Sequence, residues 1–162
     1  MASARPIDGL HAALPFAMAA AMTVRVRSDE LFGHADGVLD THDPGRVHDM
    51  RVGTRRLRAA LEIYAPCFTA TALNSVLSDV KELADGLGAR RDPDVQLEDL
   101  QAFAAALDPQ DGPGIELFAS RLRAEQEAGN EVLARALEAA TERDLRSRLT
   151  SLADEAQASV SV

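Results

Sequence analysis

The chain has 162 residues, of which 46% are hydrophobic and 27% are charged, a balance typical of a globular protein. Aromatic residues make up only 4%, while alanine and leucine dominate. This composition predicts an all-α protein, an antiparallel helical bundle of five to six helices. The net charge of −9 argues against a general nucleic-acid coat and against binding to anionic membranes.

The N-terminal part of the sequence predicts a tail and two helices. Residues 1–12 are expected to form a flexible tail, and 13–158 a single helical bundle. A first helix is expected over about 14–32, with a proline tolerated in its first turn. A turn-rich stretch then leads to an Asp-Pro pair that predicts the start of a second helix, over about 44–65.

Apolar residues at helical spacing predict the rest of the bundle, with helices over 70–87, 92–107, 115–139 and 142–157. Gly88 fits the position just after a helix, and Pro93 fits a helix start, so we expect a break between the first two of these helices. The strongest loop signal in the chain is DPQDGPG at 108–114.

The second predicted helix carries a high density of arginine. Residues 46–58 contain five Arg and one Asp, a local charge of +4. At 100° per residue, one stripe of this helix, about 110° from its apolar stripe, holds His48, Arg51, Arg55 and Arg58. Locally, only Glu62 and Asp49 offset the repulsion between the arginines of this stripe. A bound anion would offset it further, and a guanidinium donates two hydrogen bonds to a phosphate. The equally weighted alternative is that these arginines pair with carboxylates of neighbouring helices.

Two ordered motifs in this part of the chain resemble the CHAD family, the conserved histidine α-helical domains. Residues 47–58 read VHDMRVGTRRLR, and the family pattern is V-H-x-x-R-V-x-x-R-R-L-R. Residues 81–95 read KELADGLGARRDPDV, which resembles the family's K-x-L-A-x-x-L-G-x-x-R-D-x-D-V. The resemblance covers about 43–100 closely.

This resemblance implies a non-catalytic polyphosphate-binding module. CHAD domains are helical bundles that bind inorganic polyphosphate; many associate with polyphosphate granules, and some are fused to CYTH triphosphatase domains. By motif position, the residues expected to contact polyphosphate are His48, Arg51, Arg55, Arg56, Arg58, Lys81 and Arg91. The helical wheel turns Arg56 away from the stripe, toward an adjacent rim or a salt bridge. Asp92 and Asp94 are expected to cap a helix and orient arginine.

The family comparison also sets expectations for partners and location. Family members usually contain two similar bundles with facing basic helices, whereas this chain has one copy of the first motif. It is therefore expected to be a half-length member, a fragment, or one protomer of a homodimer, with an open basic groove. We expect a cytoplasmic location, including polyphosphate granules, a CYTH-type polyphosphate-processing enzyme as a partner, and no cofactor or metal.

Nucleic acid and membrane are disfavoured as partners. Single-strand binding normally needs aromatic platforms, and Tyr64, the only tyrosine, falls on the apolar stripe of its helix. The apolar run at 14–22 is too short to span a bilayer.

Two other functions remain open at this level. A histidine phosphotransfer domain would use His48 as the phospho-acceptor, with Arg51 three residues later. A metal phosphohydrolase would need ligands from several helices, and the acidic and histidine residues of 34–43 cluster instead in a turn, where such residues are common. Cys67 is expected to be a small buried hydrophobe.

Overall fold

The computed structural model describes residues 3–108 and 112–160, and within these ranges the chain is helical with no strand. The elements are α1 (Phe16–Gly33), α2 (Pro44–Ile63), the short 3-10 helix η1 (Ala65–Cys67), α3 (Ala70–Ala104), α4 (Gly112–Glu142) and α5 (Leu145–Ala158). The predicted all-α class is confirmed. The division into a tail over 1–12 and a bundle over 13–158 stays a prediction.

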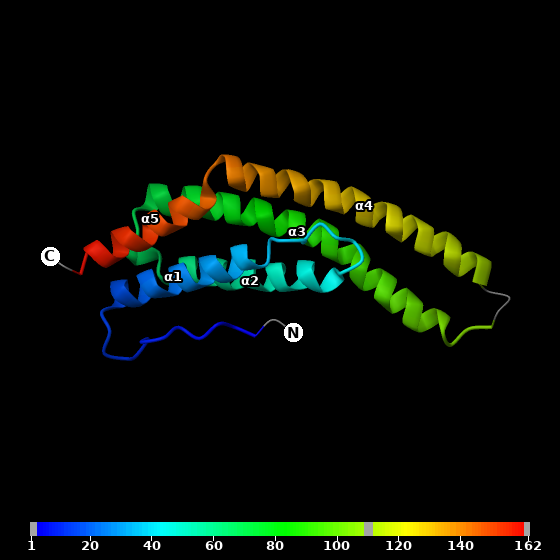
Figure 1. The fold of residues 1–162 in the computed structure, drawn as a ribbon, viewed down its shortest axis with the longest axis horizontal. Helices are drawn as coiled ribbons and strands as arrows, with labels where there is room; N and C mark the ends of the chain where they lie inside the picture. The colour runs from blue at the N-terminus through cyan, green and yellow to red at the C-terminus, as the bar shows by residue number, and fades with distance from the viewer. Residues whose placement is uncertain (1–2, 109–111, 161–162) are drawn as a thin grey trace.

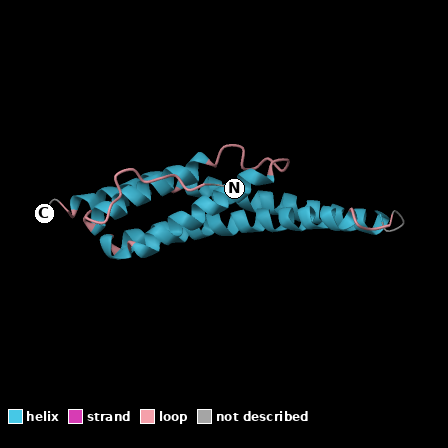
Figure 2. Cartoon of the chain, turned by 90° about the horizontal axis from the view of Figure 1, so that it is seen from below, coloured by secondary structure: helices cyan, strands magenta, loops and turns pink. Residues whose placement is uncertain are grey.

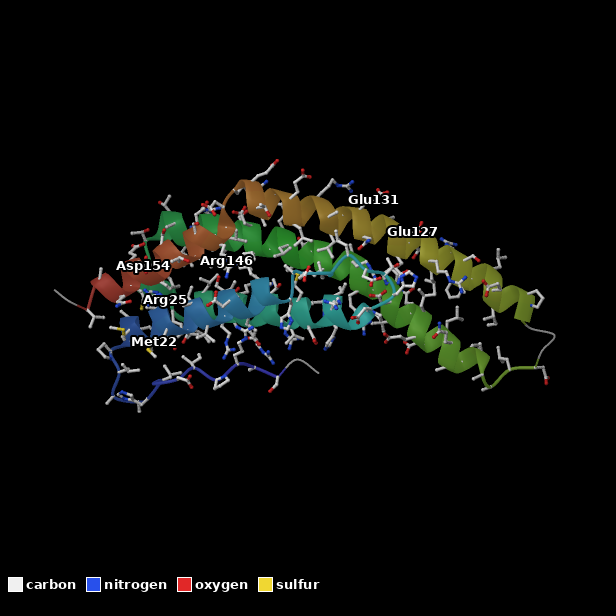
Figure 3. All side chains as sticks on the ribbon, in the orientation of Figure 1. Met22, Arg25, Glu127, Glu131, Arg146 and Asp154 are labelled. Carbon is white, nitrogen blue, oxygen red and sulfur yellow. The ribbon has the colours of Figure 1, made fainter. Side chains whose placement is uncertain are left out.

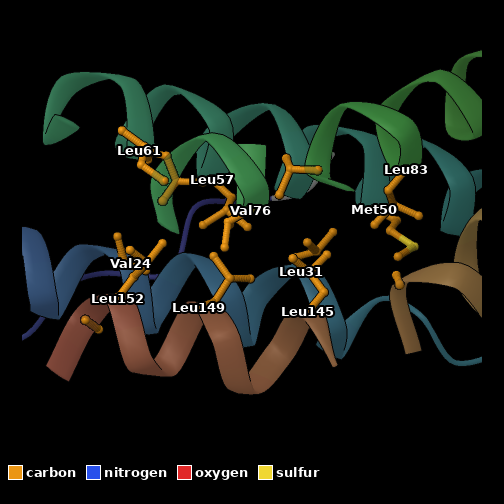
Figure 4. Packing of buried hydrophobic residues seen from close by; sticks show 14 of the residues in the cluster. Val24, Leu31, Met50, Leu57, Leu61, Val76, Leu83, Leu145, Leu149 and Leu152 are labelled. Carbon is orange, nitrogen blue, oxygen red and sulfur yellow. The ribbon is translucent and has the colours of Figure 1, made fainter. Parts of the chain in front are cut away.

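The helices pack in two layers (Figure 1). α1 and α5 lie side by side in one layer, and α2 and α3 in the other. Buried apolar side chains from all four helices meet between the layers, among them Leu31, Leu57, Val76 and Leu149 (Figure 4). Burial of such side chains contributes about 1.5–3 kcal/mol each, so this seam holds the bundle together.

α3 and α4 form the longest contact in the molecule. They contain 35 and 31 residues and run antiparallel to each other. Both helices continue past the ends of α1, α2 and α5 as a two-helix arm (Figure 2). α2 also runs antiparallel to α3, and this direction determines which of their residues lie level with each other.

The predicted break between helices at Gly88 and Pro93 is wrong, because α3 runs through both residues. Pro93 has no N–H, so the carbonyl of Ala89 lacks its usual partner four residues later. The backbone of Gly129 in α4 lies against that carbonyl, so closely that a Cβ on Gly129 would stand 2.4 Å from the Ala89 oxygen. A proline inside a helix destabilises it by about 3 kcal/mol, and the packing of α3 against α4 on both sides of Pro93 offsets this cost.

A buried polar cluster lies beside the proline. Arg90 and Asp94 form an ion pair one helical turn apart, and both side chains are almost fully buried. The amide nitrogen of Gln126 in α4 donates to the same Asp94 oxygen at 2.6 Å. The cluster therefore ties the continuous part of α3 to α4 across the position of Pro93.

The other predicted helix ends differ from the structure by a few residues. α2 begins at Pro44, with Asp43 at the N-cap, and it ends at Ile63 rather than about 65 because η1 follows. Asp43 makes no capping bond; its carboxylate instead accepts a hydrogen bond from Arg46 Nε at 2.9 Å. α4 begins at Gly112, inside the predicted loop 108–114, and residues 109–111 of that loop lie outside the described ranges.

Candidate anion-binding site

The predicted basic stripe lies on the outward side of α2. Buried residues at steps of three and four, among them Met50, Leu57 and Leu61, hold the helix against the bundle. The same period turns Arg51 and Arg55 away from the core, and both side chains are exposed. These two arginines are one helical turn apart, about 6 Å along the axis.

Arg51 and Arg55 have no ion pair and no side-chain hydrogen bond within the part of the chain that the structure describes. This sets them apart from cations of the other layer. There, Arg25 and Asp154 lie 2.6 Å apart between α1 and α5 (Figure 3), and Arg146 lies 3.2 Å from Asp29. Two adjacent guanidinium groups without an internal counter-charge among the described residues give this face of α2 a local positive charge in a chain of net charge −9, and such a charge attracts anions.

Arg56 points to α1 instead of the stripe. Its guanidinium lies 2.5 Å from Glu30, which is 1% exposed and also pairs with Arg27 at 2.5 Å. Burial by itself raises the pKa of Glu30, but the hydrogen bonds and positive charges of Arg27 and Arg56 outweigh it and hold that pKa below its usual range. In this structure Arg56 therefore ties α2 to α1, in agreement with its direction on the helical wheel.

Two other predicted cations are paired with carboxylates of their own helices. Arg58 Nε lies 3.3 Å from a Glu62 oxygen, and both side chains are about half exposed. Arg91 donates to both oxygens of Glu98, at 3.1 and 3.4 Å, and its side chain is only 16% exposed. Asp94 adds a second carboxylate, 3.9 Å from Arg91. Pairing with a carboxylate of a neighbouring helix therefore occurs at Arg56, whereas Arg58 and Arg91 pair within their own helices and Arg51 and Arg55 have no ion pair among the described residues.

His48 and Arg91 come together although they are 43 positions apart in the sequence. They line one hollow of about 370 Å³, together with Pro44, Gly45, Asp49 and Glu98. His48 is half-buried and has no hydrogen-bond partner among the described residues. The hollow lies at the N-terminus of α2, where the helix dipole favours negative charge.

The antiparallel pairing of α2 and α3 sets the position of Lys81. His48 and Arg91 line the same hollow, so they lie level with each other. Ten residues further along α2 is Arg58, and ten residues earlier in α3 is Lys81. Because the two helices run antiparallel, Arg58 comes level with Lys81. Lys81 is exposed and is turned about 80° around α3 from Arg91. It lines a hollow between α3 and α4, whose acids include Glu82 and Asp85. The structure therefore brings Arg91, but not Lys81, into the hollow beside His48.

Glu62 is one of the two local acids that the sequence places near the arginines of α2, and it pairs with Arg58, whereas Glu98, which pairs with Arg91, was not predicted. A local signal for both exists. Glu62 follows Arg58 by four residues and Glu98 follows Arg91 by seven, and both spacings place the two side chains on one helix face. Among 26 acidic residues, however, a spacing of seven does not single out Glu98.

The acidic turn before α2 is organised by its own short-range contacts. The backbone N–H of His42 donates to Asp40 at 2.9 Å, and His42 Nδ1 lies 3.1 Å from the same oxygen. These contacts lower the pKa of Asp40. Over residues 3–108 and 112–160, no group of three or more His, Cys, Asp or Glu side chains is arranged to hold a metal ion.

Comparison with known proteins gives one match. The family model described as CHAD domain matches residues 24–161, nearly the whole chain. No curated protein and no solved structure matches it. In the described ranges, none of the helices combines the length and the apolar composition needed to cross a membrane.

Proposed function

Because the chain belongs to the CHAD family, a family linked to polyphosphate binding, we propose that it is a non-catalytic module that binds inorganic polyphosphate along the exposed stripe of α2. The observation that carries this proposal is the pair Arg51 and Arg55. Both are exposed and one turn apart, and neither has an internal partner in the described ranges.

The spacing of the row suits a linear polyanion. From His48 to Arg58 the stripe spans ten residues, about 15 Å along the helix axis. Arginine stays charged at every physiological pH and donates two hydrogen bonds to a phosphate. A flexible phosphate chain needs only successive cations, so it can follow the row from one turn of the helix to the next.

Nucleic acid fits this surface less well. Single strands bind largely by stacking bases on aromatic side chains. Tyr64 packs against Phe16, with ring centroids 4.9 Å apart, so its ring takes part in packing between α1 and the end of α2. The row of cations on α2 therefore favours a ligand without bases.

The test is a titration with long-chain polyphosphate at low ionic strength, in competition with tripolyphosphate and with single-stranded DNA. We expect the long chain to bind and the DNA to compete only weakly, and we expect affinity to fall as salt rises. DNA that competes as well as polyphosphate would overturn the proposal, as would no binding at low salt. An acid-labile phosphohistidine at His48 after incubation with a phosphodonor would support the phosphotransfer alternative instead.

The proposal extends to location and partners. We expect the protein in the cytoplasm, at polyphosphate granules, with a CYTH-type polyphosphate-processing enzyme as partner. The arm carries exposed apolar side chains at Phe103, Leu117 and Phe118, which offer contact area to a second copy. Mass measurement in solution, with and without polyphosphate, tests the homodimer.

A further inference from the structure

The cations of the proposed site fall into two kinds. In the middle of the row, Arg51 and Arg55 are open, with no ion pair among the described residues. At the two ends, internal carboxylates hold the cations: Glu62 on Arg58 and Glu98 on Arg91. The same row is therefore open at its centre and occupied at its ends.

The two ends lie close to the open centre. Arg58 follows Arg55 by three residues, about 4.5 Å along the helix axis. At the other end, Arg91 lies beside His48, which is three residues before Arg51. A phosphate chain bound at the centre needs less than one further helical turn in either direction to reach a held cation.

We propose that Glu98, with a smaller contribution from Glu62, makes this row selective for long phosphate chains over short ones; the inference rests on the proposed function. A short chain binds only the open centre. A long chain, once bound there, displaces the carboxylates and takes over Arg91 and Arg58.

The selectivity follows from effective concentration. A carboxylate tethered to the same helix competes at a local concentration on the order of millimolar or higher. A separate short phosphate arriving from solution must overcome this competitor at its own low concentration. In a long chain already bound at Arg51 and Arg55, the next phosphates are tethered as well. Their local concentration therefore matches that of the carboxylates, and each phosphate brings a further negative charge to compete for Arg58 or Arg91.

The contribution of Glu98 exceeds that of Glu62 because the arginine that it holds is more buried and is bound through two hydrogen bonds. Arg58 and Glu62 are 44% and 52% exposed, and water screens such pairs strongly. Glu98 is similarly exposed, at 53%, but Arg91 is only 16% exposed, so water screens its guanidinium less, and both of its terminal nitrogens donate to Glu98. Release of Arg91 is therefore the larger barrier to a short ligand.

The experiment compares Glu98→Gln and the double variant Glu62→Gln/Glu98→Gln with the unaltered protein, using tripolyphosphate and long-chain polyphosphate as probes. Asp49→Asn is the matched control, because Asp49 lines the same hollow but has no ion pair among the described residues. We expect Glu98→Gln to raise the tripolyphosphate affinity about threefold and the long-chain affinity less, so that the preference for the long chain falls. Asp49→Asn should raise both affinities alike.

An unchanged or increased preference for the long chain in the double variant would overturn this inference. Loss of negative charge by itself would raise the affinity for the long chain at least as much as the affinity for tripolyphosphate, so it would not lower the preference. A thermal melt close to that of the unaltered protein excludes misfolding of the variant. Failure of the proposed function looks different: long chains would not bind, or their binding would not depend on Arg51 and Arg55. Binding that depends on these arginines, with an unaltered chain-length preference in the double variant, refutes only the role of the two carboxylates.

Discussion

Removal of the two open arginines tests the proposed site most directly. In Arg51→Ala/Arg55→Ala, no internal ion pair among the described residues is broken, because neither side chain has one. The melting temperature is therefore expected to stay within a few degrees of the original value, and a change in binding reports the ligand contact alone. Arg58→Ala should weaken binding less, because Arg58 must leave Glu62 before it contacts a ligand.

The size of the loss follows from exposure. Charge-assisted hydrogen bonds contribute about 1.5–3 kcal/mol when shielded from water, but exposed charge pairs typically contribute only about 0.2–1 kcal/mol. With about 0.7 kcal/mol for each exposed arginine, the double variant loses about 1.4 kcal/mol, a tenfold weaker affinity. By analogy with single-stranded nucleic acids, the slope of log affinity against log salt should also become shallower by about 1.4.

The assay is a calorimetric titration with long-chain polyphosphate at several salt concentrations. Arg121→Ala/Arg123→Ala serves as the control, because it removes the same charge from exposed positions on α4 whose partners are Glu125 and Glu116. An affinity within twofold of the original in the stripe variant would refute the reasoning. An equal loss in the control would show that net charge, and not the stripe, determines binding.

Three further predictions concern stability and reactivity. The ion pairs of Glu30 hold its pKa below the usual 4.5, so the ionised side chain contributes stability above about pH 4.5 that is lost as pH falls through the lowered pKa. The urea midpoint of the unaltered protein should therefore fall more steeply in acid than that of Glu30→Gln. Gly129→Ala should destabilise the protein by about 1–3 kcal/mol, because the new Cβ would lie 2.4 Å from the backbone oxygen of Ala89. Gly88→Ala places its Cβ in open space and should stabilise α3 by up to about 1 kcal/mol; thermal melts measure both effects. Burial raises the pKa of the Cys67 thiol, so alkylation by iodoacetamide at pH 7.5 should be slower than in the urea-unfolded chain, and equal rates would contradict this.

The sequence predicted the site in part. Helical period alone placed His48, Arg51, Arg55 and Arg58 on one stripe and turned Arg56 away from it, and the structure agrees for each position on α2. The period could not identify the partner of Arg56, because Glu30 is 26 residues away on another helix. It also could not separate the open arginines from those held by Glu62 and Glu98. Whether two side chains form an ion pair depends on their rotamers and on the neighbouring helices, which the helical period does not describe.

Local chemistry by itself therefore determined the helical class, the start of α2 at Pro44 and the spacing of its cations, because these depend on neighbours within a few residues. Tertiary structure decided the rest. α3 continues through Pro93 because α4 packs against it there, with Gly129 allowing the close approach. His48 and Arg91 line one hollow because α2 and α3 pack side by side and run antiparallel. In both cases the deciding contacts join residues far apart in the chain, where the free energy of packing exceeds any local preference.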